Sequence, residues 1–198
     1  MNQRLIWNFE INPQPPLDLN ALATSEEDKI KWEARFFWPE NTIIVLTGLP
    51  ANCLDLTKYQ IKKREDQYLL LPGCDYNIKR RRGQLLYKPQ LQCTDNIRGY
   101  GKKINLNEDG LGQLLIENQR LSILTNEITV CKIALIHEFP TEPTIKLELA
   151  RLEVAQKIFF SACIEGRSQN LVEQISKHLL GNEVSCDYVS FLQKIQTS

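Results

Sequence analysis

The stretch REDQYLLLPGCDYNIKRRRGQLLYKP, residues 64–89, decides the expected fold. It has the composition of two or three β-strands joined by short turns, one at Pro-Gly and one at Arg-Gly-Gln. It also carries the densest block of positive charge in the chain. Side chains alternate along a strand, so Lys79 and Arg81 share one face of the basic run and the neighbouring arginines share the other. We expect the cations of this hairpin to point at an anion inside a β-barrel.

Length and composition place few limits on the function. The chain of 198 residues is long enough for one sizeable core, so we expect a single domain over residues 1–198, with residues 1–30 as an N-terminal extension and residues 182–198 as a C-terminal helix. Lys+Arg and Asp+Glu are equal at 24 each. General attraction to nucleic acid or to an anionic membrane needs a basic surplus, so neither partner is expected. A local basic site remains open, and the sequence leaves the oligomeric state open.

The cysteines and the first residues indicate the compartment. Six cysteines lie far apart with no CxxC pair, and MNQRLIWNFE has no apolar segment of the kind found in secretory signals. No run approaches the 18 apolar residues of a membrane span. An even cysteine count without a secretory signal does not indicate a disulfide framework. We therefore expect a reduced, cytoplasmic protein.

Four further runs alternate as strands do. They are WEARFFW at residues 32–38, ITVCKIALIHEF at residues 128–139, TIKLELARLE at residues 144–153 and IFFSACIEG at residues 158–166. Helices are expected over residues 108–120 and over residues 168–180, the latter with a Ser168 cap and a Gly181 stop. Residues 1 to about 24, with their NPQPP run, are expected to be an extended lead-in.

These elements predict an α+β protein with an eight-stranded antiparallel β-barrel, or tunnel, and flanking helices. An open sheet or sandwich, in which the polar face meets water, is the commoner arrangement for alternating strands. In a barrel the polar face lines a lumen and helices cover the outside. The apolar side chains of the outer face favour the barrel because they are too bulky and numerous to be left wet. They are Phe36, Trp38, Ile145, Leu147, Phe160 and Ile164.

An ordered series of short motifs over roughly residues 32–180 resembles the CYTH superfamily. The series is WEARFF, RED-x-Y, IKRRRG, LLYK, GKK, TVCK, a LEL strand, and a CIEG strand followed by a helix. CYTH proteins are the triphosphate tunnel enzymes, which include class IV adenylate cyclases and thiamine triphosphatases. The resemblance implies an eight-stranded tunnel in which basic side chains grip a triphosphate and carboxylates hold a divalent metal.

The resemblance also implies roles for particular residues. The implied phosphate-binding residues are Arg35, Lys79, Arg81, Lys88, Lys103 (or Lys102 in another register) and Lys132. The implied ligands of Mg²⁺ or Mn²⁺ are Glu33, Glu148 and Glu165. The chain departs from the family pattern at three positions: Arg35 replaces the second acid of the opening motif, Phe37 its lysine, and Cys163 the first acid of the closing motif. Arg35 adds a positive charge that disfavours a second metal ion. No catalytic residue is assigned.

Three functions remain open at this point. The first is a metal-dependent triphosphatase, a phosphohydrolase acting on an inorganic or organic polyphosphate. The second is a module that binds a tri- or polyphosphate or a nucleotide without metal chemistry. The third is a non-catalytic carrier barrel for another acidic ligand, for instance a tetrapyrrole with propionates. Each motif also has a plain structural explanation, since the basic run suits a solvated hairpin tip and Lys132 suits a buried ion pair with Glu148 or Glu165.

Overall fold

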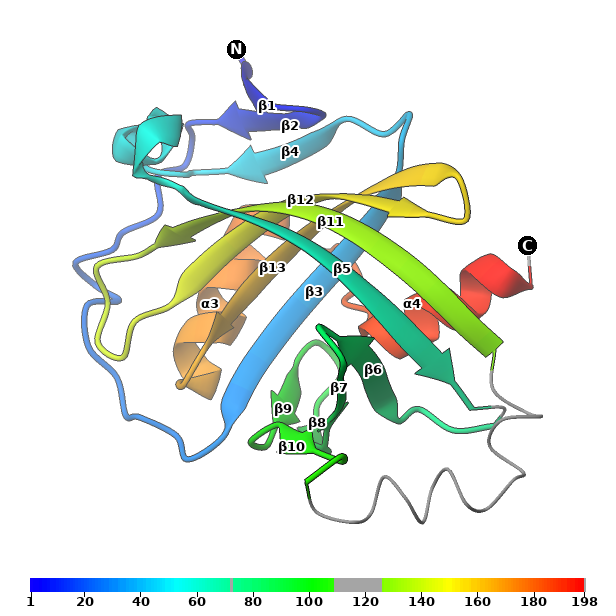
Figure 1. The fold of residues 1–198 in the computed structure, drawn as a ribbon. Helices are drawn as coiled ribbons and strands as arrows, with labels where there is room; N and C mark the ends of the chain where they lie inside the picture. Colours follow the sequence, from blue (N-terminus) through cyan, green and yellow to red (C-terminus); the bar gives the residue numbers. More distant parts are fainter. Residues whose placement is uncertain (72, 109–125, 198) are drawn as a thin grey trace.

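The fold was analysed in a computed structural model, which describes residues 1–71, 73–108 and 126–197. Within these ranges the protein is mostly β, with one large antiparallel sheet, one small mixed sheet and two α-helices. Figure 1 shows the large sheet curling strongly around one of its faces. This curl gives the large sheet a concave inner face and a convex outer face.

The large sheet has ten strands. In chain order they are β3 (Lys31–Pro39), β5 (Gln60–Leu70), β6 (Asn77–Arg81), β7 (Gln84–Lys88), β8 (Gln90–Cys93), β9 (Arg98–Tyr100), β10 (Ile104–Asn105), β11 (Asn126–Glu138), β12 (Lys146–Val154) and β13 (Lys157–Gly166). The small sheet is formed by β1 (Gln3–Ile6), β2 (Phe9–Asn12) and β4 (Ile44–Thr47), and two 3₁₀ turns follow it, η1 (Ala51–Leu54) and η2 (Leu56–Lys58). The helices are α3 (Gln169–Leu180) and α4 (Tyr188–Gln196).

The order of hydrogen-bonded strands corrects the expected barrel. The order is β10-β7-β6-β5-β11-β12-β13-β3-β9-β8, so the sheet is a strongly curled half-barrel of ten strands rather than a closed ring of eight. Pro89 connects β7, near one edge, directly to β8 at the other edge. The carbonyl of Pro89 accepts a hydrogen bond of 3.0 Å from the amide of Gly101. The antiparallel pairing and the curl agree with the prediction, whereas the strand count and the closure do not.

The part of the convex face that carries the bulky outer residues is covered, as those residues predicted. Phe36, Trp38, Ile145, Leu147, Phe160 and Ile164 all lie in one buried cluster. Leu171, Ile175 and Leu179 of α3 join this cluster from one element. Phe9 and Ile11 of β2, with Ile44 and Leu46 of β4, join it from the small sheet.

The elements that cover the convex face are α3 and the small sheet, and the sequence predicted only the first of them. The α3 helix forms where predicted, with the Ser168 side chain accepting a hydrogen bond from the Leu171 amide and with Gly181 at its end. Residues 1–24 are not a plain extended lead-in, because β1 and β2 form a hairpin whose second strand pairs in parallel with β4. The helix expected over residues 108–120 lies almost wholly outside the described residues.

The α4 helix fills part of the concave face. Asp187 caps it by accepting a hydrogen bond from the Ser190 amide, and its buried side chains are Tyr188, Val189, Phe191 and Leu192. They pack against inward-facing residues of β5, β11 and β12, including Tyr68, Val130 and Leu152. One part of the concave face is therefore apolar and filled, and the remaining part lies open to polar side chains.

All six cysteines are free. In the part of the chain that the structure describes, neither helix has the length and apolar composition needed to cross a membrane.

The packing of α4 predicts a large loss of stability on truncation of Phe191. Its ring stacks on Phe37 at 3.8 Å between ring centroids and meets Phe159 edge-on at 5.2 Å. Phe191→Ala is expected to lower the free energy of unfolding by about 3 to 5 kcal/mol, because it leaves a cavity between α4 and the sheet. Urea denaturation measures this change. Val184→Ala, at a side chain 80% exposed, is the control and should change stability by less than about 0.5 kcal/mol. Equal effects of the two substitutions would contradict this packing.

Candidate anion-binding site

The open part of the concave face is a cavity of about 500 Å³, within the usual size range of small-molecule sites. Thirteen of its lining residues are Lys or Arg and three are Glu, so more than half of the 24 basic residues of the chain meet here. The basic lining residues are Lys29, Lys31, Arg35, Lys62, Arg64, Lys79, Arg81, Lys88, Lys102, Lys103, Lys132, Lys146 and Arg167. The zero net charge of the whole chain thus conceals a strongly cationic interior.

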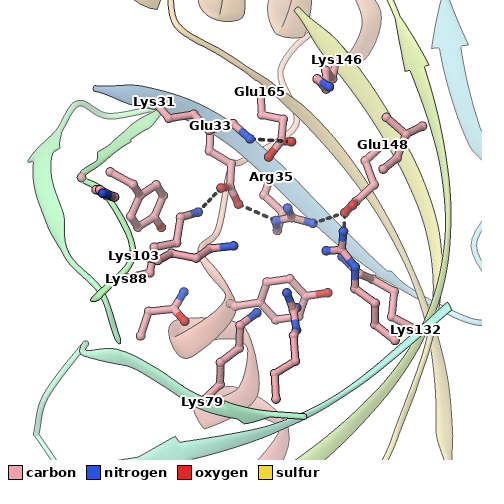
Figure 2. A pocket seen from close by; sticks show the side chains of 18 of the residues that line it. Lys31, Glu33, Arg35, Lys79, Lys88, Lys103, Lys132, Lys146, Glu148 and Glu165 are labelled. Atoms are coloured by element: carbon pink, nitrogen blue, oxygen red, sulfur yellow. Dashed lines mark hydrogen bonds and ion pairs between the residues drawn. The ribbon is translucent and has the colours of Figure 1, made fainter. Parts of the chain in front are cut away.

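The strand register places the charged side chains in rows across the sheet. Glu33 of β3 pairs with Glu165 of β13, which pairs with Lys146 of β12. One step further along the strands, Arg35 pairs with Cys163, which pairs with Glu148. Directly paired residues of neighbouring strands point to the same face, so each row projects into the cavity. Figure 2 shows these side chains converging from separate strands.

Arg35 lies at the centre of a buried ion-pair network. Its Nε lies 2.8 Å from Glu33 Oε1, and one terminal nitrogen lies 3.0 Å from Glu148 Oε1. Lys88 contacts the other oxygen of Glu33, and Lys132 Nζ lies 2.9 Å from Glu148 Oε1. Arg35 and both glutamates are no more than 7% exposed. Burying these charges is tolerable because each carboxylate has two cationic partners.

A second ion-pair group is built on Asp66 of β5. Lys79 Nζ lies 2.9 Å from Asp66 Oδ2, and Arg81 contacts the same carboxylate through two nitrogens. Lys79 also lies 3.3 Å from the Tyr68 hydroxyl. The hairpin of β6 and β7 thus turns Lys79 and Arg81 inward, as the alternation predicted, and leaves Arg80 exposed. The interpretation of this run as a solvated hairpin tip is therefore wrong for its two inward side chains.

Tyr188 of α4 forms a floor beneath the network. The Arg35 guanidinium carbon lies 4.9 Å from the centre of the Tyr188 ring, and Lys132 Nζ lies 5.7 Å from it. Lys88 lies over the Tyr100 ring at 3.6 Å. Aromatic faces stabilise such cations without neutralising them. The cations therefore keep their charge for a ligand.

The protonation states follow from burial and from these partners. Burial raises the pKa of Glu33, but Lys88 and Arg35 outweigh it and hold the pKa well below the usual value. Lys132 and Arg35 likewise hold the pKa of Glu148 low against burial. Burial lowers the pKa of Lys79 to about 7, with Asp66 opposing and Arg81 adding to the shift. The charge of Lys79 therefore changes with pH near neutrality.

Five of the lining cations make no ion pair or side-chain hydrogen bond with the residues that the structure describes. They are Lys29, Lys62, Arg64, Lys102 and Lys103. Burial and the nearby Arg81 and Lys88 lower the pKa of Lys103, which indicates a cation held among like charges. Cations arranged in this way have donors and charge available for an anion.

All the residues implied by the CYTH resemblance line this cavity. Arg35, Lys79, Arg81, Lys88, Lys103 and Lys132 meet there with Glu33, Glu148 and Glu165, and Lys102 lines it as well. Of the two partners expected for Lys132, Glu148 is the one it contacts, at 2.9 Å, whereas Glu165 lies 2.7 Å from Lys31. The roles of these residues in binding stay predictions.

Sequence reasoning missed six of the lining cations, which are Lys29, Lys31, Lys62, Arg64, Lys146 and Arg167. It also missed Asp66, which pairs with two of the inner cations, and Tyr188. Asp66 belongs to the quoted RED-x-Y motif, and the alternation of Arg64, Asp66 and Tyr68 on one face of β5 was a usable signal. Tyr188 had no such signal, because only the docking of α4 on the concave face brings it to the cavity.

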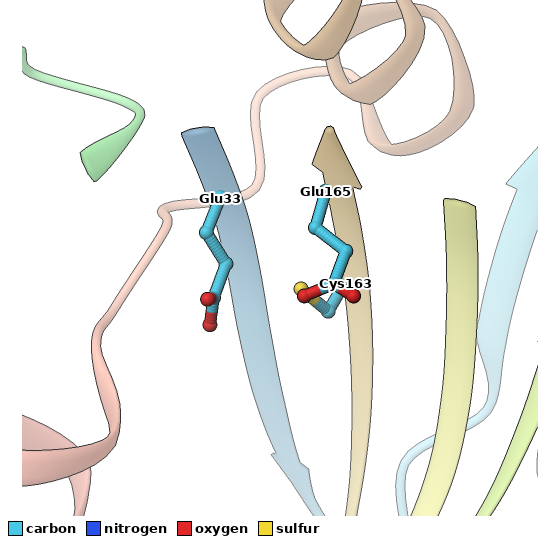
Figure 3. A group of neighbouring side chains, drawn as sticks. All are labelled: Glu33, Cys163 and Glu165. Carbon is cyan, nitrogen blue, oxygen red and sulfur yellow. The ribbon is translucent and has the colours of Figure 1, made fainter. Parts of the chain in front are cut away.

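The carboxylates fit a divalent metal ion poorly. Mg²⁺ and Mn²⁺ need several hard oxygen ligands. Both oxygens of Glu33 contact cations, and Glu148 Oε1 is shared by two. Glu33 and Glu165 do approach each other beside Cys163, with ligand atoms of all three within 4.8 Å (Figure 3). Burial raises the pKa of Cys163 well above the ordinary value, and its soft sulfur suits neither Mg²⁺ nor Mn²⁺.

Comparisons with known proteins found structural likeness only. No protein-family model and no curated protein matches the chain. The fold is similar to that of the PH1819 protein from Pyrococcus horikoshii OT3, with 18% identity, a TM-score of 0.41, and coverage of 83% of this chain and 99% of the other. It is also similar to a candidate adenylate cyclase from Bacillus halodurans, with 14% identity, a TM-score of 0.38, and coverage of 69% and 82%. Likenesses this distant carry no conclusion on ligand or activity.

The pKa of Lys79 predicts a pH-dependent contribution to stability. Its pKa is about 7 in the folded protein against the ordinary 10.5, so between these values the unfolded chain binds more protons. The contribution of Lys79 to the free energy of unfolding therefore increases as pH rises through this window. We expect the stability of the wild type relative to Lys79→Met to rise steadily from pH 7 to pH 9 in urea denaturation. A difference that stays constant over this range would contradict the assigned environment of Lys79.

Proposed function

We propose that the protein binds a phosphate-rich anion, a tri- or polyphosphate or a nucleotide, in a cationic tunnel formed by the concave face of the large sheet. The observation that carries this proposal is the convergence of thirteen Lys and Arg side chains on one cavity with only three lining glutamates. A surplus of this size in one cavity favours the binding of a multiply charged anion. Phosphate chains offer the highest density of negative charge among common small ligands, and Lys and Arg are the side chains that bind them.

The arrangement of the inner cations adds to this support. Three carboxylates hold five of these cations in fixed positions. Glu33 and Glu148 share Arg35, and they also contact Lys88 and Lys132 respectively. Asp66 contacts Lys79 and Arg81. Binding then costs little side-chain entropy, because the donors are already ordered. The excess charge comes from Lys62, Arg64 and Lys103, which have no ionic partner within residues 1–71, 73–108 and 126–197.

Metal-dependent hydrolysis of the bound anion is the further activity that the CYTH resemblance implies. One observation favours it, the approach of Glu33 and Glu165 within one potential cation site. Saturation of Glu33 and Glu148 by Arg35 and two lysines weighs against it. We therefore place binding first and triphosphatase activity second. The carrier of an apolar acidic ligand has the least support, because α4 already fills the apolar part of the concave face.

Two neighbouring lysines of β5 provide a matched test of anion binding. Lys62 lines the cavity, whereas Lys63 is exposed on the other face of the same strand. Lys62→Glu is expected to weaken tripolyphosphate binding about tenfold, or ~1.4 kcal/mol, because it places a negative charge beside the ligand. Lys63→Glu changes the net charge equally and should alter the dissociation constant by less than about twofold. Isothermal titration calorimetry measures both. Equal losses in the two variants would indicate nonspecific attraction, and no binding by the wild type would overturn the proposal.

Phosphate release separates binding from hydrolysis. A binding function predicts no release of phosphate from tripolyphosphate above the rate without protein, in Mg²⁺ or in Mn²⁺. Release that disappears in Glu148→Ala and persists in Glu153→Ala would establish the triphosphatase instead. Glu153 lies on β12 but is exposed on the convex face, so it controls for effects of the substitution on the strand.

A further inference from the structure

Arg35 lies where two buried carboxylates converge inside the cationic cavity. Glu33 and Glu148 come from strands that are separated by β13, and both direct an oxygen at the Arg35 guanidinium, at 2.8 and 3.0 Å. Figure 2 shows the guanidinium between the two carboxylates. In a phosphate site, carboxylates that converge in this way are the usual ligands of a divalent cation. Here a side-chain cation fills the space between them.

The strand register explains how Arg35 reaches Glu148. Arg35 pairs with Cys163 and Cys163 pairs with Glu148, so the two ends of the ion pair are two strands, or roughly 10 Å, apart along the sheet. The long arginine side chain spans this distance across the small side chain of Cys163. Arg35 and Cys163 together therefore allow a link that a carboxylate at residue 163 would interrupt.

Three of the four oxygens of the glutamate pair already contact side-chain cations. Lys88 occupies the second oxygen of Glu33, and Lys132 shares the Glu148 oxygen with Arg35. A divalent ion would have to enter beside three cations that are already within ion-pair distance of these carboxylates. Coulomb repulsion between charges this close, in a buried site, opposes its entry.

We propose that Arg35 takes the place of a divalent cation between Glu33 and Glu148, so that the cavity binds its phosphate-rich anion free of metal. This inference rests on the function proposed above. It specifies that the ligand is the uncomplexed anion and that its charge is balanced by side chains alone.

The wild-type protein tests the inference directly. Tripolyphosphate is titrated into the protein in a calorimeter, once with EDTA and once with Mn²⁺, with the free tripolyphosphate corrected for its complex with Mn²⁺. We expect dissociation constants that agree within about threefold. A loss of more than tenfold in EDTA would overturn the inference while leaving the proposed function in place. Absence of binding in both conditions would overturn the proposed function, and the inference with it.

Mn²⁺ binding without phosphate provides a second readout. Electron paramagnetic resonance of Mn²⁺ should detect no saturable site in the wild type at the glutamate pair. Arg35→Gln removes the competing charge and should bind Mn²⁺ at least tenfold more tightly, and the double variant with Glu148→Gln should lose this gain. Arg151→Gln removes one positive charge from the convex face and should behave as the wild type. Mn²⁺ binding by the wild type as tight as that of Arg35→Gln would overturn the inference. Circular dichroism shows whether Arg35→Gln folds. If it does not fold, the calorimetric titrations of the wild type decide the inference.

Discussion

Three buried carboxylates allow lysine and arginine side chains to be packed together inside this protein. Like charges cannot be crowded into a cavity unless nearby opposite charges offset their repulsion and their loss of water. Glu33, Asp66 and Glu148 do this for the inner cations, since each contacts two of them. These ion pairs offset the desolvation of the inner cations. The lining cations outside the network are available to a ligand. The cavity is thus a structured cationic site and not a gap in the core.

The curl of the large sheet turns this network into a site. The part of its convex face that carries the bulky apolar side chains is buried beneath α3 and the small sheet, whereas the open part of its concave face carries the charged side chains of the cavity. The α4 helix closes the apolar part of that face and adds the Tyr188 ring below Arg35 and Lys132. Apolar packing on one side and ion pairs on the other therefore divide the concave face into a filled part and an open part.

Alternation along single strands made much of this arrangement predictable. The residues of WEARFFW lie on the expected faces, with Trp32, Ala34, Phe36 and Trp38 in the outer core and Glu33 and Arg35 in the cavity. A lysine in an otherwise apolar strand indicated a buried partner for Lys132, and Glu148 is that partner. These inferences succeed because a period of two is a local property of the backbone.

Long-range contacts set the limit of prediction. The strand count and the open edge of the sheet depend on pairings between distant segments. The strands β1 and β2 were not predicted, because the proline-rich run near the start of the chain indicated an extended segment. Total charge was misleading, because the acidic residues that balance the chain lie mostly away from the cavity. The exchange of a carboxylate for Arg35 could be seen in the sequence as a departure from the CYTH pattern. Its link to Glu148 across Cys163 required the register of three strands.

A crystal structure grown with tripolyphosphate in EDTA tests the central claim most directly. The account predicts density for the anion inside the cavity, with phosphate oxygens within hydrogen-bond distance of Lys79, Arg81, Lys88 and Lys103 and with Arg35 still between its two glutamates. Density for the anion only on the convex face would contradict the account. A cavity that is closed by its own side chains, in crystals that contain no bound anion, would also contradict it.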